Sequence, residues 1–290
     1  NNLFSYQKKR PDRTIAFSLL ASALSACGGG GGGGTNMSNL SSSPPNGQKY
    51  TPSISHASSI SFGLTGDGLI DGTTHGSKWD IQSTIGTPLQ NSTNAPRMGY
   101  AIANGFNGET WQDPTKALDM LGAAMTKFGD ITGVMTTPIA KWMKIPGQTS
   151  YGYYNNHVFD NPTEAYNAGA TIVLSIDGNL ITSWAGNNAW AIGFPPDRNI
   201  NDLWEGNAGD VLINMNSPGY YLPPSAYEIG GDGFTLILHE LGHALGLKHP
   251  HDDGGSGRPT FSEIGLPWDD EMFTVMSYND AFGDVLHSPA

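Results

Sequence analysis

The sequence has a single cysteine, few basic residues and no basic cluster in its body. Cys27 is the only cysteine among 290 residues, so the chain cannot form an intramolecular disulfide. Burial or a bound metal must stabilise it instead. Lysine and arginine number 14 against 26 aspartates and glutamates, which gives a net charge of −12. A basic nucleic-acid footprint is absent, and we expect no nucleic-acid partner.

The apolar run near the N-terminus, Ile15–Ala26, is too short to span a bilayer as a helix. Basic residues precede it, which is typical of an export signal: Lys8, Lys9, Arg10 and Arg13. The run ends at Leu24-Ser25-Ala26-Cys27, which resembles the lipobox of bacterial lipoproteins. The resemblance implies a signal peptide over residues 1–26 and a lipidated Cys27 that holds the protein on a membrane of the cell envelope. A conventional signal followed by secretion is the alternative.

A run of small and polar residues follows the cysteine. Residues 28–34 are all glycine, and Ser, Asn, Pro and Gly dominate to about residue 53. No strand pattern precedes the glycines and no Gly-Lys-Ser/Thr follows them, so a phosphate-binding loop is excluded. We expect residues 27–54 to be a flexible tether and residues 55–290 to form one folded domain.

The stretch Phe234–Pro250, FTLILHELGHALGLKHP, contains the spacing H-E-x-x-H-x-x-G-x-x-H. Residues four apart lie on one face of a helix, so His239 and His243 can place two imidazoles on one metal ion. Gly246 can end that helix in the left-handed conformation and let the chain return His249 as a third ligand. Three neutral imidazoles with one open position are typical of a catalytic zinc site.

Glu240 follows His239 directly, so it lies beside the metal position rather than beneath it. A carboxylate there can take a proton from a water molecule and pass it to a leaving amine. The spacing therefore predicts His239, His243 and His249 as zinc ligands and Glu240 as general base and acid.

A second motif, Thr274-Val275-Met276-Ser277-Tyr278, follows the zinc motif. A downstream methionine turn accompanies the long zinc motif in metzincins. Together the two motifs resemble the metzincins, and Met-Ser-Tyr after a His-Pro third ligand resembles their serralysin branch. The resemblance implies that Met276 packs beneath the zinc histidines. It also implies that Tyr278 is a displaceable zinc ligand that stabilises the transition state.

The same resemblance implies an α+β fold. It consists of a twisted, mostly parallel five-stranded sheet with long helices, the zinc helix and the Met-turn. Residues 188–196 match the sheet-edge strand on which an extended substrate is bound in this family, although an ordinary hairpin strand explains them equally well. Serralysins continue past the Met-turn into a helix and a calcium-binding β-roll, so we expect this chain to be truncated at its C-terminus. Within residues 252–257 the spacing of known calcium loops is absent, so a Ca²⁺ ion has no support there.

Local signals place further elements. We expect strands at Ile60–Leu64, Met98–Ala103, Ile131–Thr137, Thr171–Ile176 and Gly209–Asn214. Asp113-Pro114 and Asn161-Pro162 each combine a capping residue with a proline at the first helical position, so a helix should follow each. Asp232 or Thr235 is the expected cap of the zinc helix.

These observations predict a zinc-dependent endopeptidase that binds protein or peptide substrates in extended form, attached to the cell envelope through Cys27 or secreted. Two alternatives stay open from the sequence. One is a zinc-stabilised surface module that binds without hydrolysis, although the intact Glu240 argues against it. The other is a zinc hydrolase of cell-wall peptides.

Overall fold

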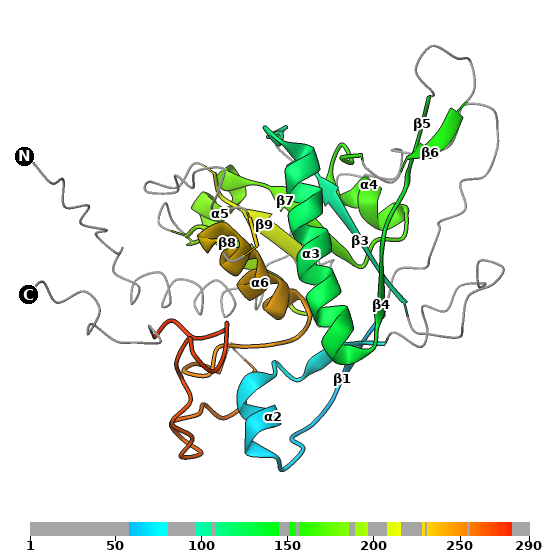
Figure 1. Cartoon of the computed structure of the whole chain (residues 1–290). Helices are drawn as coiled ribbons and strands as arrows, with labels where there is room; N and C mark the ends of the chain where they lie inside the picture. Colours follow the sequence, from blue (N-terminus) through cyan, green and yellow to red (C-terminus); the bar gives the residue numbers. More distant parts are fainter. Residues whose placement is uncertain are drawn as a thin grey trace, which may run out of the picture.

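The computed structural model describes residues 58–80, 97–105, 108–144, 151–154, 157–185, 189–196, 208–215, 228–229, 231–253 and 256–279. The expected signal peptide, Cys27 and the tether lie outside these residues, as does the C-terminal end of the chain. The described part forms a central sheet with helices on both faces, and a lower end built mainly from loops (Figure 1). Within it, no helix has both the length and the apolar character needed to cross a membrane.

The central sheet has five strands in the order β4-β3-β7-β9-β8. Four of them run parallel: β3 (Arg97–Ala103), β4 (Met135–Pro138), β7 (Ile172–Ile176) and β9 (Asp210–Ile213). The last, β8 (Ala191–Gly193), pairs antiparallel with β9 and forms one edge of the sheet. The expected mostly parallel five-stranded sheet is therefore confirmed, and β8 falls within the segment predicted for an edge strand.

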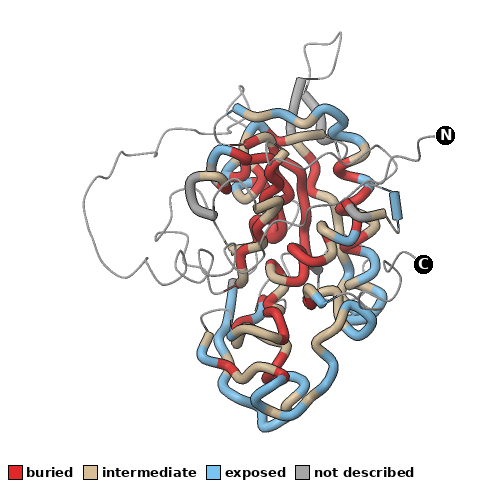
Figure 2. Tube along the Cα trace, turned by 90° about the vertical axis from the view of Figure 1, so that its left-hand side faces the viewer, coloured by how far each residue is buried: buried red, intermediate tan, exposed pale blue. Residues whose placement is uncertain are grey.

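Buried side chains alternate between the two faces of the sheet, as the period of a strand requires. Ile172 and Leu174 of β7 pack on the face covered by α3 (Pro114–Thr132) and α6 (Asp232–Ala244). Val173, between them, packs on the opposite face with α4 (Pro162–Asn167). Because helices cover both faces, the inner strands are mostly apolar, with Ser175 of β7 and Asp210 of β9 as buried polar exceptions. Figure 2 shows the buried residues concentrated around the sheet and α6, and a more exposed lower end.

The helix starts were predicted well where a side chain caps the helix. Asp113 accepts a hydrogen bond from the backbone N–H of Lys116 at the start of α3. Asn161 does the same for Glu164 at the start of α4. In both helices proline occupies the first helical position, where its missing N–H is not needed.

Two local predictions were wrong. The strand expected from Ile131 begins only at Met135, because α3 continues through Thr132 and ends at Gly133, whose φ of 73° stops the helix. Helix α6, for which Asp232 or Thr235 was the expected cap, is preceded by Gly231 and has no side-chain cap. Thr235 instead donates its hydroxyl hydrogen to the carbonyl oxygen of Gly231. The β-branched Ile131 favours a strand, but the helix continues past it and ends only at Gly133.

The remaining elements lie at the margins of the sheet. At the lower end, β1 (Ser58–Ser61) pairs antiparallel with β2 (Ser77–Asp80), and α2 (Gly68–Thr73) lies between them in sequence. Elsewhere, β5 (Lys141–Lys144) and β6 (Tyr151–Tyr154) form an antiparallel pair. The helix α5 (Gly178–Ala185) follows β7, and Glu109 accepts hydrogen bonds from the backbone N–H groups of Gly178 and Asn179 at its start.

A buried ion pair joins the two sequence segments that make up the lower end. Arg258 donates from Nη1 to Asp71 Oδ1 at 3.1 Å, and from Nη2 to the carbonyl oxygens of Phe62 and Gly63. Asp71 also accepts from the backbone N–H groups of Thr65 and Gly66. A carboxylate that accepts several hydrogen bonds is favoured in its charged form. The pKa of Asp71 is accordingly lowered, chiefly by the N–H of Thr65, with a smaller contribution from Arg258.

We predict that Asp71→Asn lowers the free energy of unfolding at pH 7, and that this loss shrinks in acid. Because the pKa of Asp71 is lower in the folded chain than its ordinary 3.8, the carboxylate stabilises the fold above that value. Its contribution is lost as the pH falls through the folded-state pKa. Urea midpoints of the native and variant proteins from pH 7 down to pH 3 measure the difference. A difference independent of pH contradicts the assignment.

Candidate metal centre

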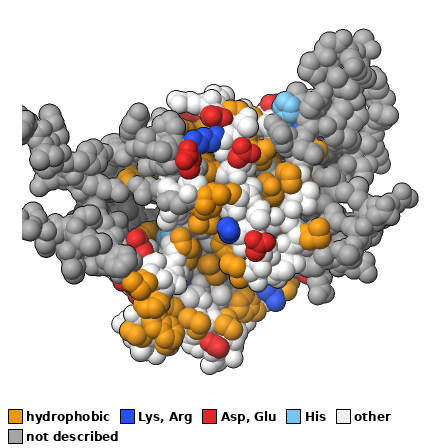
Figure 3. Space-filling view, viewed as in Figure 1, with side chains coloured by type: hydrophobic (Ala, Val, Ile, Leu, Met, Phe, Trp, Pro, Cys, Tyr) orange, Lys and Arg blue, Asp and Glu red, His pale blue; other side chains and the backbone are white. Residues whose placement is uncertain are grey.

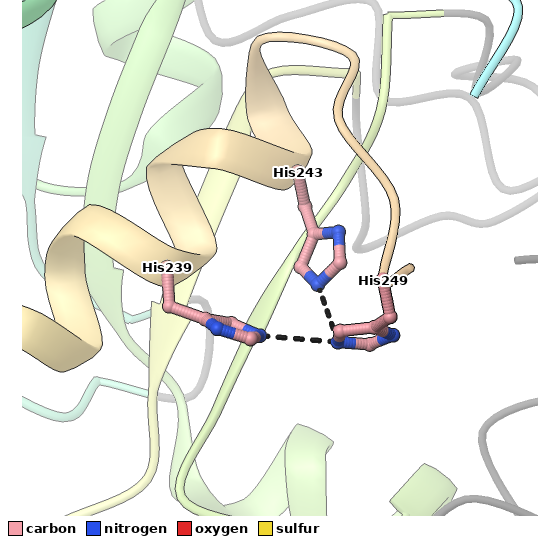
Figure 4. Close-up of side chains that lie close together, drawn as sticks. All are labelled: His239, His243 and His249. Carbon is pink, nitrogen blue, oxygen red and sulfur yellow. Dashed lines mark hydrogen bonds between the residues drawn. The ribbon is translucent and has the colours of Figure 1, made fainter. Parts of the chain in front are cut away.

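His239, His243 and His249 converge at one point although the third is delivered by a separate loop. Figure 4 shows the two rings of α6 and the ring from the following loop turned toward one another. The Nε2 atoms of His239 and His243 each lie 3.1 Å from Nε2 of His249. Ligands held tetrahedrally at 2.0–2.1 Å from zinc are about 3.3 Å apart, so the spacing fits one such ion.

The tautomers of the three rings follow from their outer partners. Nδ1 of His239 lies 2.7 Å from the carbonyl oxygen of Val275, and Nδ1 of His243 lies 3.0 Å from that of Leu247. Carbonyl oxygens only accept, so each Nδ1 carries the hydrogen and each Nε2 keeps its lone pair. Nδ1 of His249 lies 2.8 Å from the carboxylate of Asp252, which fixes the same tautomer.

The site therefore presents three acceptor nitrogens to one another with no hydrogen between them. Such an arrangement is repulsive unless a cation occupies its centre. Burial lowers the pKa of His239 to about 4 and holds the pKa values of His243 and His249 well below their usual range. Neutral imidazoles are the form that binds zinc. The donor set and its tautomers thus fit a zinc ion.

Glu240 directly follows His239 on α6, and the residue is 6% exposed. The backbone N–H of Gly193 on β8 donates to its carboxylate. Burial raises the pKa of Glu240 to about 8, against which this hydrogen bond acts weakly. A nearby divalent cation would lower that pKa again, because opposite charge favours the ionised carboxylate. The position thus suits a group that exchanges a proton near neutral pH.

The edge strand β8 runs directly against the zinc helix. A Cβ atom added at Gly193 would overlap the backbone carbonyl oxygen of Glu240, so only glycine allows this close approach. The strand edge and the proton-transfer group are therefore held together by backbone contact. An extended peptide on that edge would pass beside the three histidines.

The turn that delivers His249 is clamped by the N-terminal segment of the domain. Gly246 has a φ of 104°, and a Cβ there would overlap the carbonyl oxygen of Ser77. His75 donates its N–H to the carbonyl oxygen of Gly246, and Lys248 donates its N–H to that of Thr73. The indole N–H of Trp79 reaches the carbonyl oxygen of Ala244 at 2.8 Å. The chain reversal after α6 is thus fixed from outside as well as by glycine.

The structure brings Met276 and Tyr278 to the site as well. Met276 is buried, and its sulfur packs on Gly242 of α6, where any larger residue would overlap it. The ring of Tyr278 stacks on His239, with centroids 5.1 Å apart and an interplanar angle of 20°. It also lies 4.8 Å from the ring of His249. All six residues singled out from the sequence therefore lie together.

Three groups that contact the histidines were not predicted from the sequence. Asp252 was not singled out from the sequence, yet it holds the ring of His249. His251 was not singled out either, yet it stacks on His249 with centroids 5.1 Å apart. The carbonyl oxygen of Val275 holds His239, and no side-chain pattern reports a backbone acceptor. Only the three-residue spacing from His249 to Asp252 was a usable signal.

Among the described residues, two groups of three have the geometry to hold a metal ion. The first is His239, His243 and His249. The second, His249, His251 and Asp252, shares a histidine with the first. Because Asp252 faces the outer nitrogen of His249, it supports the first group as a hydrogen-bond partner.

Part of the chain is similar to bacterial serralysins. It is 35% identical over 106 residues to Serralysin G of Dickeya chrysanthemi, which covers 36% of this chain and 19% of that protein. It is 34% identical over 86 residues to Metalloprotease AprA of Pseudomonas entomophila, covering 25% and 18%. The serralysin of Proteus mirabilis is 36% identical over 69 residues, covering 23% and 14%. The chain thus spans about a fifth or less of these curated relatives.

No protein-family model matches the chain, and no solved structure matches it significantly. The partial similarities support a serralysin-like metalloprotease of the metzincin class. A mixed α/β fold with a mostly parallel five-stranded sheet and a three-histidine cluster agrees with that class.

We predict that Asp252→Ala weakens zinc binding about 10- to 100-fold, the usual effect of removing a partner of a ligating histidine. Asp252→Asn keeps an acceptor oxygen for Nδ1 of His249 and should bind zinc with intermediate affinity. Competition with a chromophoric chelator measures both constants. Asp130→Asn, a carboxylate on α3, is the control. Equal affinity in the alanine variant and the native protein contradicts this role.

Proposed function

We propose that the chain is a zinc-dependent endopeptidase with a metzincin catalytic domain over residues 55–290. The observation that carries the proposal is the buried Glu240 beside three imidazoles whose lone pairs converge. A purely structural zinc site has no use for a buried carboxylate at that position. The partial similarity to serralysins points in the same direction.

His239, His243 and His249 are the proposed zinc ligands. Zinc supplies Lewis acidity toward water and toward the scissile carbonyl when it is bound. Glu240 takes a proton from the attacking water and passes it to the nitrogen of the leaving amine. Burial raises the pKa of Glu240 to about 8, and the positive charge of a bound cation would act in the opposite direction.

Substrate binding is assigned to the edge strand β8. An extended peptide that pairs with Ala191–Gly193 adds a strand to this edge of the sheet. It then lies next to a strand that already contacts Glu240. Tyr278 is the proposed donor to the oxyanion of the tetrahedral intermediate, and Met276 supports the zinc helix from below. These roles follow the resemblance to serralysins and the neighbourhood of each side chain.

We also propose that residues 1–26 are an export signal and that a lipidated Cys27 with a tether over residues 27–54 holds the domain at the cell envelope. This proposal depends on the lipobox-like Leu24–Cys27 and on the absence of any other cysteine. Mass spectrometry of the membrane fraction, which detects a diacylglycerol adduct on Cys27, tests it.

We predict that Glu240→Gln lowers the rate of casein cleavage about 10²- to 10⁴-fold, as expected for loss of a general base. The variant should still bind about one zinc ion, because its three imidazoles are unchanged. Casein hydrolysis with and without a zinc chelator, together with metal analysis, measures both effects. Glu228→Gln is the matched control, because it makes the same substitution at an exposed carboxylate outside the helices and strands.

The substrates that the native protein cleaves distinguish the endopeptidase from the binding module and from the cell-wall hydrolase. Zinc binding without cleavage of casein by the native protein favours a surface binding module. Cleavage of cell-wall peptides without cleavage of casein favours the cell-wall hydrolase. Either result, or full activity in Glu240→Gln, overturns the endopeptidase proposal as stated.

We predict that Tyr278→Phe lowers kcat by about 10²-fold and leaves KM nearly unchanged. A donor that acts only on the developing oxyanion contributes to the transition state and not to the bound substrate. Phenylalanine keeps the stacking on His239, so the position of the ring should not change. Steady-state kinetics on a fluorogenic peptide separate the two constants. A rise in KM at constant kcat would assign Tyr278 to substrate binding instead.

A further inference from the structure

The segment after the third histidine exposes large apolar side chains. Trp268, Met272 and Phe273 are 39%, 56% and 60% exposed, and the rings of Trp268 and Phe273 lie 6.5 Å apart. We call these three residues the Trp268 patch. Figure 3 shows hydrophobic side chains gathered at the lower end of the molecule, where this segment and α2 lie. A contiguous apolar patch with a polar rim is a mark of an interaction site.

The rim of the patch is acidic. Within residues 249–279 there is one basic residue, Arg258, and it is buried in the ion pair with Asp71. The preceding Lys248 is also buried, and its amine donates to the carbonyl oxygens of His249 and Asp252. The acidic or basic residues nearest to the patch in sequence are therefore all acidic: Glu263, Asp269, Asp270 and Glu271.

The patch is attached to the metal centre by the residue that follows Trp268. Asp269 accepts a hydrogen bond from the hydroxyl of Ser277, the neighbour of Tyr278, at 2.7 Å. Its Oδ1 also lies 3.4 Å from Nδ1 of His251, which stacks on His249. Asn279 holds the same segment through its side-chain amide, which donates to the carbonyl oxygen of Asp269. A chain bound on the patch would therefore lie close to the three histidines.

We propose that the Trp268 patch and its acidic rim dock a basic, apolar stretch of a polypeptide substrate, in which lysines or arginines flank aromatic or aliphatic side chains. The apolar side chains would bury Trp268, Met272 and Phe273, and the cations would lie against the acidic rim. This inference depends on the proposed peptidase function, whose substrate class it specifies.

Charge favours this occupant over two others. Anionic lipids would be repelled by the acidic side chains that flank the patch in this segment. A second copy of the chain would bring the same patch against itself, because a two-fold dimer uses one surface on both subunits, and like charges would then face each other. A basic polypeptide is not repelled in either way, because its charge is opposite to that of the acidic rim.

Docking away from the reacting bond contributes equally to the bound substrate and to the transition state. Such uniform binding lowers KM and leaves kcat unchanged. Loss of the patch should thus raise KM only for substrates long enough to reach it. A short peptide that covers the scissile bond alone should be cleaved as before.

Direct binding tests the proposal independently of catalysis. Zinc-loaded Glu240→Gln protein is titrated against a dye-labelled peptide with lysines around a Trp-Leu core, and anisotropy gives Kd. We expect Trp268→Ala/Phe273→Ala to weaken binding about tenfold or more, the range found for aromatic residues at interface centres. Ile131→Ala, which removes an 83% exposed side chain at the end of α3, is the control. The same peptide with glutamates for lysines should bind much more weakly, and added salt should weaken the basic peptide.

Kinetics of the Glu240-containing protein complete the test. The double variant should raise KM for the extended basic substrate and leave the short peptide's kcat/KM within about twofold, because the patch is outside the reacting groups. Peptide binding without any cleavage would refute the peptidase and keep the docking site. Equal binding of basic and acidic peptides would overturn the docking proposal, and so would equal binding by native and double-variant protein. It would also fall if the double variant abolished only vesicle binding or self-association, measured by co-sedimentation and sedimentation velocity.

Discussion

Three imidazole lone pairs that face one another with no hydrogen between them are the constraint on which this structure depends. Each Nε2 is left as an acceptor because each Nδ1 donates outward, to Val275, Leu247 and Asp252. Without those outer partners, a ring could flip or protonate and relieve the repulsion. The outer partners come from the Met-turn, from the turn after α6 and from the following loop. The geometry of the candidate metal centre therefore depends on three separate segments of the chain.

These segments have little apolar core of their own. The hydrophobic cluster that includes α6 is formed with α3 and the sheet, so it fixes His239 and His243 through the helix. His249, by contrast, follows a reversal held by backbone hydrogen bonds to residues 73–79 and by the buried amine of Lys248. The N-terminal segment is in turn fastened to residue 258 by an ion pair. Polar contacts between segments distant in sequence thus hold the lower end together, whereas hydrophobic packing holds the helices against the sheet.

The parts that the sequence predicted share one property, which is that local spacing determines them. The spacing from His239 to His249, the caps Asp113 and Asn161, and the apolar runs of β7 and β9 all act within a few residues. The contacts between distant residues were not predictable. Trp79 reaches Ala244, and Arg258 pairs with Asp71, across sequence separations of 165 and 187 residues. Asp252 was missed for another reason: an aspartate beside glycines is usually solvated, and only its distance from His249 reveals its role.

The same segment that completes the metal centre also carries the acidic surface around Trp268, and the two facts are connected by charge. Two buried bases, Lys248 and Arg258, place positive charge inside the lower end, and a divalent cation held by the three histidines would add to it. Acidic residues around them offset that charge across short distances. Asp71 neutralises Arg258 directly, and Asp252 lies between Lys248 and His249. Three further acids of the segment, Asp253, Glu263 and Glu271, are exposed. A loop built to hold a cation from within thereby presents negative charge to its surroundings.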